Sequence, residues 1–124
     1  MKASVLAFLS VGALAAGMHY VVAIISHALG LTPATANWLG FACAFPVSYI
    51  GHRHWTFRGA RSSHRQAFPK FLTVALLGFF GNQALLWCGL HWTAWPFWLV
   101  LALVMVLVAA STYVLSRFWA FAHG

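Results

Sequence analysis

The sequence predicts an all-α membrane protein with four membrane-spanning helices. Of its 124 residues, 63% are hydrophobic and only 6% are charged, whereas a soluble domain carries about a quarter charged residues. Four apolar stretches, at residues 5–28, 34–50, 71–90 and 96–115, each approach the ~17–25 residues that a helix needs to cross the hydrocarbon layer. Their continuous apolarity disfavours a membrane β-barrel. We expect one transmembrane domain over residues 1–124.

The first stretch also has features of a signal peptide, because Lys2 precedes it and the small segment Ala13-Leu14-Ala15 lies within it. We favour a helix that is retained. The segment Phe8-Leu9-Ser10-Val11 recurs as Phe71-Leu72-Thr73-Val74 in the third stretch, and a removable leader has no reason to share in an internal repeat.

Helix boundaries and bends are indicated by the prolines. Thr32 followed by Pro33 predicts the start of the second helix. Pro46 is expected to bend that helix, and Pro69 is expected to mark the start of the third. Along the second helix, small residues recur at every fourth position and predict its packing face; these are Ala36, Gly40, Ala44 and Ser48.

Two polar side chains, His19 and Asn82, lie within the apolar stretches. They are 63 residues apart, the same separation as the recurring segment above, so we expect them at corresponding depths. A polar or ionisable group at such depth normally faces a cavity or a partner. Each could bond to a neighbouring helix or line a path for a polar headgroup.

A second recurrence links the ends of the two halves. Residues 52–57 (HRHWTF) return in altered form as residues 116–121 (SRFWAF), 64 positions later. Each copy places Arg, Trp and Phe at alternate positions directly after an apolar stretch. We therefore predict two parallel two-helix repeats, about 4–57 and 70–121, related by an axis along the membrane normal.

The positive charges predict the orientation. Lys2 precedes the first helix, five cations lie between the second and third helices, and Arg117 follows the fourth. By the positive-inside rule, both termini and the central loop are cytoplasmic, and Trp55 and Trp119 suit the inner interface. The basic loop is expected to anchor on anionic membrane lipid. We expect no nucleic acid partner, since four spans leave no soluble domain.

The chain contains no Asp or Glu, which excludes carboxylate acid–base pairs and Ser-His-Asp triads. We expect no enzymatic activity, cofactor or metal site. Arg53 and Arg117 must then be neutralised by solvent, backbone carbonyls, another protein or a lipid phosphate, which guanidinium matches through paired donors. Interfacial anchoring is an equal alternative for Arg117, whereas His52 and His54 favour a binding site around Arg53.

The doubled Arg-x-Trp-x-Phe ending, in residues 48–57 and 113–121, resembles the GtrA family, as does Asn82 after the Lys70-Phe71-Leu72 entry to the third helix. The resemblance covers essentially the whole chain. Many members have Asn before the first Arg, where this sequence has His52.

The resemblance implies that the protein translocates, or flips, a polyprenyl-phosphate-linked sugar across the bacterial inner membrane for cell-surface polysaccharide biosynthesis. Arg53, Arg117 and Lys70 would bind the phosphate. The headgroup or sugar would contact the remaining candidates, which are His52, His54, Trp55, Trp119, His19 and Asn82. The alternative is a non-transporting adaptor that recruits or stabilises a glycosyltransferase. Because 124 residues hardly enclose a path, we expect a homodimer or larger oligomer.

Overall fold

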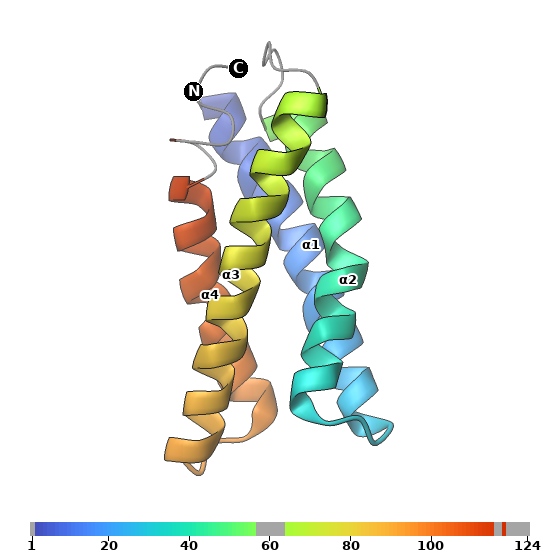
Figure 1. The fold of residues 1–124 in the computed structure, drawn as a ribbon, viewed down its shortest axis with the longest axis vertical. Coiled ribbons are helices and arrows are strands. Elements are labelled where there is room, and N and C mark those ends of the chain that lie inside the picture. The colour runs from blue at the N-terminus through green and yellow to red at the C-terminus, as the bar shows by residue number, and fades with distance from the viewer. Residues whose placement is uncertain (1, 57–63, 116–117, 119–124) are drawn as a thin grey trace.

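The protein is a bundle of four helices, as the sequence predicts (Figure 1). The computed structural model describes residues 2–56, 64–115 and 118, and no strand occurs among them. The helices are α1 (Lys2–Ala28), α2 (Pro33–Gly51), α3 (His64–Trp92) and α4 (Phe97–Leu115), and a π-helix, η1 (His52–Thr56), extends α2. Two segments, Leu6–Ala28 of α1 and Phe68–Trp92 of α3, are long and apolar enough to cross a membrane, and Phe97–Ser111 is a shorter apolar helix.

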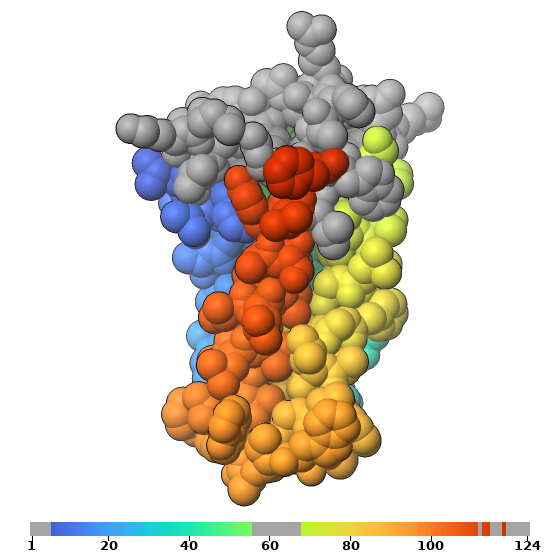
Figure 2. Space-filling view, turned by 90° about the vertical axis from the view of Figure 1, so that its left-hand side faces the viewer, coloured from blue at the N-terminus to red at the C-terminus, as the bar shows by residue number. Residues whose placement is uncertain are grey.

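The four helices form two hairpins that lie side by side. α1 packs most extensively on α2, and α3 on α4, while α2 also touches α3 and α1 also touches α4. α1 and α3 begin at the end of the bundle where η1 and α4 finish (Figure 1). We call this the basic end, because Arg53 and Lys70 lie there, and the opposite end, with the short connections 29–32 and 93–96, the hairpin end. Figure 2 shows α4 in front, between α1 and α3.

The start of α2 follows the sequence prediction. The Thr32 hydroxyl accepts the backbone N–H of Thr35, and Pro33 occupies the first turn, where its missing N–H costs no helical hydrogen bond. Of the predicted small-residue face, Ala36, Gly40 and Ala44 are buried. Pro46 lies inside α2, and the bend expected there stays a prediction.

The prediction that α3 begins at Pro69 is wrong. The helix begins at His64 and Pro69 lies within it. Arg65, Gln66 and Ala67 all favour helix, and a proline so close to the start has little more than one turn before it to disturb. The second half of the expected loop is therefore helical, while Arg58 and Arg61 lie outside the described residues.

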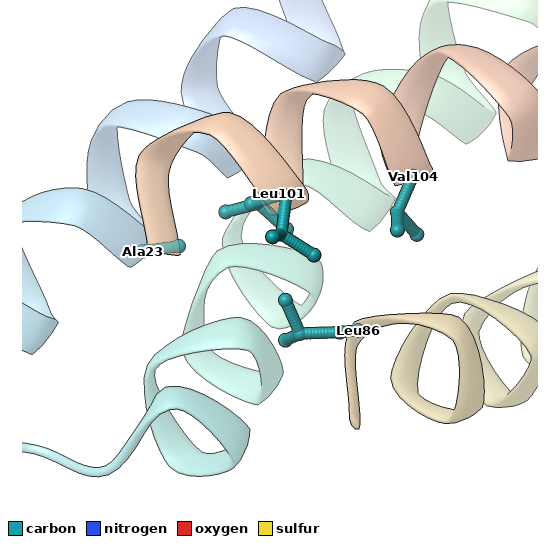
Figure 3. Close-up of a cluster of buried hydrophobic side chains, with 5 residues drawn as sticks. Ala23, Leu86, Leu101 and Val104 are labelled. Atoms are coloured by element: carbon teal, nitrogen blue, oxygen red, sulfur yellow. The ribbon is translucent and has the colours of Figure 1, made fainter. Parts of the chain in front are cut away.

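Two clusters of buried apolar side chains hold the helices together. Nearer the basic end, Tyr49 of α2 packs with Phe71 and Val74 of α3. Nearer the hairpin end, a second cluster joins α1, α3 and α4 (Figure 3); it comprises Ala23, Leu86, Val100, Leu101 and Val104. Between these two clusters the side chains leave a cavity.

Candidate functional site

A partly open cavity of about 160 Å³ lies between the helices, with walls from all four helices and η1. Its wall includes Phe8, His52 and Phe71 toward the basic end, and His19 and Asn82 near the middle of the spans of α1 and α3. About one turn further along α1 and α3, the cluster of Figure 3 packs between the helices. The cavity is therefore mainly apolar, with polar groups at both of its ends.

The residues around this cavity come in pairs with a constant separation along the chain. Each lining residue of α1 has a lining residue of α3 63 positions later, giving the pairs Phe8/Phe71, Gly12/Ala75, Ala15/Gly78, Ala16/Phe79 and His19/Asn82. Between α2 and α4 the separation is 64, in the pairs Phe41/Met105, Ala44/Val108 and Phe45/Ala109. These are the two separations at which sequence segments recur.

A hydrogen-bonded network borders the end of the cavity that lies near the middle of the bundle. His19 Nε2 lies 2.6 Å from Asn37 Oδ1, and since this oxygen can only accept, Nε2 donates. Asn37 Nδ2 donates to Asn82 Oδ1 at 2.6 Å and to Gln83 Oε1 at 3.1 Å, and Gln83 Nε2 donates to the carbonyl of Ala34. Asn37 thus links α1 to α3 from its position on α2.

Asn37, the centre of this network, was not predicted from the sequence. Its side chain is fully buried, whereas His19 and Asn82 are 8% and 3% exposed. The signal that could have found it is the one used for Asn82, an amide within an otherwise apolar stretch. Gln83, the residue after Asn82, is a further amide in the same apolar stretch.

His52 borders the opposite end of the cavity. Its backbone N–H bonds to the carbonyls of Ser48 and Tyr49, where α2 passes into η1. The imidazole is buried, stacks on Phe8 with ring centroids 5.1 Å apart, and lies 6.1 Å from the ring of Phe71. Burial lowers the pKa of His52 to about 4, so the ring is neutral at pH 7 and offers one donor and one acceptor.

Comparison with known families decides the assignment. A family model described as GtrA/DPMS, transmembrane domain, matches residues 7–121. The chain belongs to this family. This match confirms the GtrA resemblance of the two Arg-x-Trp-x-Phe segments. It also confirms the prediction of a membrane protein. Searches of curated proteins and of solved structures found no match.

The GtrA/DPMS domain brings together three of the predicted site residues, since His19, Asn82 and His52 all line the cavity. Arg53 is half-buried and does not line it, but follows His52 in the chain, and the exposed Lys70 precedes Phe71. His54 and Trp55 are exposed and also lie off the cavity wall. Arg117 and Trp119 lie outside the described residues.

The low pKa of His52 predicts that this GtrA/DPMS domain loses stability in acid. Between the ordinary pKa of 6.5 and about 4, the unfolded chain binds a proton that the folded chain does not, so stability falls as pH falls through this window, by up to about 3 kcal/mol. The measurement is the unfolding free energy of purified protein at pH 7 and pH 4.5. His52→Phe should reduce the difference, and an equal loss in both proteins would contradict the prediction.

Proposed function

We propose that this GtrA/DPMS domain binds a polyprenyl-phosphate-linked sugar and moves it across the bacterial inner membrane. The observation that carries the proposal is the cavity, which is apolar along its walls and has polar side chains at both ends. The neutral His52 and the amide of Asn82 suit sugar hydroxyl groups. The cationic Arg53 and Lys70, each next in sequence to a lining residue, suit the phosphate.

We further propose that all four helices cross the membrane with the basic end in the cytoplasm. Two features support this orientation. Arg53 and Lys70 share the basic end, as the positive-inside rule requires of cytoplasmic segments. At the hairpin end Trp92, Trp95 and Trp98 are all more than half exposed, as in the aromatic belt at a membrane interface.

The two hairpins are proposed to be parallel repeats of one unit. The constant separations of the paired lining residues support this relation, because an axis that exchanges the hairpins would place equivalent residues on opposite walls of one central cavity. A pair of ring contacts supports it independently. Phe8 meets Tyr113 edge-on at 4.4 Å, and Phe71 meets Tyr49 edge-on at 5.5 Å. Exchange of the repeats converts one contact into the other.

In this scheme the phosphate is held at the basic end by Arg53 and Lys70, together with Arg117. The sugar contacts His52 first, with His54, Trp55 and Trp119 at the same membrane level. It then reaches the network of His19 and Asn82 in the interior. Because a cavity of about 160 Å³ is small for a full translocation path, we propose that the working form is a homodimer or larger oligomer.

A second candidate function is favoured by the packing beyond the cavity. The cluster of Ala23, Leu86 and Leu101 fills the bundle on the hairpin side of the network, so the headgroup has no open route through the described helices. A non-transporting adaptor, which binds the lipid and recruits a glycosyltransferase, needs no such route.

The deciding experiment measures transfer of a labelled polyprenyl-phosphate sugar between the leaflets of proteoliposomes. For a flippase, Arg53→Ala is expected to slow transfer about 10–100-fold, since a hydrogen bond to a charged group contributes about 1.5–3 kcal/mol. Lys2→Ala is the matched control, because it removes one positive charge from the same end but adjoins no lining residue. An unchanged rate with Arg53→Ala would eliminate phosphate capture by this residue. Absence of transfer by the wild type, with co-purification of a transferase, would favour the adaptor.

A further inference from the structure

We infer that the hydrocarbon chain of the bound lipid leaves the cavity through the α1–α4 seam, the line along which α1 of one hairpin meets α4 of the other. The inference rests on the proposed function, because it locates the tail of the same ligand. The hairpins meet along two such lines, the α1–α4 seam and the α2–α3 seam. Under the proposed repeat these seams are equivalent, but the side chains that form them differ in size.

The α2–α3 seam is closed by aromatic rings. Phe41 stacks on Phe79 with centroids 4.6 Å apart, and Phe45 lies 5.8 Å from Phe71. Trp38 covers Phe79 from outside at 4.4 Å. Phe71 and Phe79 are only 1% and 3% exposed, and Phe41 and Phe45 are half-buried, so aromatic rings cover the cavity on this side.

At the equivalent positions of the α1–α4 seam the side chains are smaller. Ala16 stands in place of Phe79, Ala109 in place of Phe45, and Met105 in place of Phe41; all three line the cavity. Ala16 is half-buried and Ala109 is exposed. A residue that both lines the cavity and is exposed at the bundle surface marks a thin place in the wall. Gly12 lines the same wall, and a Cβ added to it would meet nothing within 4 Å.

Two side-chain contacts nonetheless join α1 to α4 along this seam. Near the basic end Phe8 packs against Tyr113 at 4.4 Å. Toward the hairpin end the Tyr20 hydroxyl donates to the carbonyl of Trp98 at 2.8 Å. Ala16, Met105 and Ala109 lie between these two contacts along their helices. Figure 2 looks onto this side of the molecule, with α1 beside α4. We call the part of the seam formed by Ala16, Met105 and Ala109 the window. Its side chains are smaller than those at the equivalent positions of the α2–α3 seam, and the Phe8–Tyr113 and Tyr20–Trp98 contacts hold the two helices together on either side of it.

The size of the ligand explains why such a window is needed. A cavity of about 160 Å³ accommodates a headgroup but not a long polyprenyl chain, which is far more stable in the hydrocarbon of the bilayer. Once the sugar and then the phosphate have moved from the basic end into the cavity, the lipid must therefore cross the wall where its chain begins. The window lies between the level of His52 and that of His19, beside the proposed headgroup path.

The test closes the window with the rings of the other seam. Ala16→Phe combined with Ala109→Phe copies Phe79 and Phe45. The matched control is Ala13→Phe with Ala110→Phe, since both alanines are exposed on the same helices and neither lines the cavity. The probes are undecaprenyl phosphate, followed by native mass spectrometry of the full chain in nanodiscs, and the short dimethylallyl phosphate, followed by ligand-observed NMR.

Closing the window is expected to weaken undecaprenyl phosphate binding at least about tenfold and to change dimethylallyl phosphate binding less than about twofold. The control pair should leave both unchanged. Equal long-chain binding by the closed variant and the wild type would overturn the inference and leave the proposed function standing. Failure of the wild type to bind either phosphate would overturn both. A change in oligomeric state without a change in binding would assign the seam to contact between two copies and also overturn the inference.

A measurement on the unaltered chain keeps the test decisive if the closed variant does not fold. Undecaprenyl phosphate carrying a photoreactive group in its first isoprene units should label α1 and α4 around Ala16, Met105 and Ala109. Labelling confined to the outer face of the α2–α3 seam, at Trp38 and Phe80, would place the chain on the opposite side and overturn the inference.

Discussion

Gly40→Ala is expected to destabilise the protein by about 3 kcal/mol, the upper end of the cost of overpacking. A Cβ on Gly40 would lie 2.5 Å from the backbone oxygen of His19 and 2.6 Å from its ring. Backbone cannot rotate away as the end of a long side chain can, so α1 and α2 would have to separate. The same movement would displace the ring of His19 from Asn37, and ligand binding should weaken together with stability.

The unfolding free energy in a denaturing detergent titration measures this effect, and Gly17→Ala provides the control. Gly17 lies inside α1, as Gly40 lies inside α2, but an added Cβ there would meet nothing within 4 Å. Because alanine has the higher helix propensity, Gly17→Ala should be neutral or stabilising by up to about 1 kcal/mol. Similar losses at both positions would show that close approach of the helices does not determine the cost.

Asn37→Leu is expected to lower the unfolding free energy by about 2–5 kcal/mol, since it removes three interhelical hydrogen bonds worth roughly 0.6–2 kcal/mol each. His19, Asn82 and Gln83 would lose these bonds. Their polar groups, now buried without this partner, would raise the cost further. Because α1, α2 and α3 all join through Asn37, the cavity should also lose its binding geometry.

A double-mutant cycle separates the hydrogen bond from the change in volume. Asn37→Leu and Asn82→Leu should show a coupling energy of about 1 kcal/mol or more, since they remove partners of one bond. Ser111→Ala is the control for loss of a hydroxyl, because the exposed Ser111 hydroxyl donates within its own helix, to the carbonyl of Leu107. Additive effects of the two leucine substitutions would mean that the amide pair contributes nothing to stability.

The sequence predicted the helical class, the four apolar segments and two of the buried polar residues. His19 and Asn82 could be found because a polar side chain is conspicuous in an apolar stretch. Asn37 could have been found by the same rule. That Asn37 rather than solvent or lipid would be their common partner could not be predicted, because the rotation of each helix about its axis determines which side chains meet.

The start of α3 was mispredicted because proline was treated as a boundary. The favourable propensities of residues before Pro69 extend the helix outward by more than a turn. The residues that line the cavity could not be predicted from the sequence either. Arg53 was the centre of the predicted site, but His52, the residue before it, faces the cavity, since adjacent residues on a helix point in directions about 100° apart.

By itself the sequence determined that this is a membrane protein, its helical class and its family, because these depend on composition and on motifs that can be read along the chain. The tertiary structure alone decided that Phe8, His19, Phe71 and Asn82 border one space, and that one of its side walls is built of rings and the other of small residues. The physical reason is that helices apolar on nearly every side carry little information about which face turns inward. That choice is made by packing and hydrogen bonding between hairpins distant in the chain.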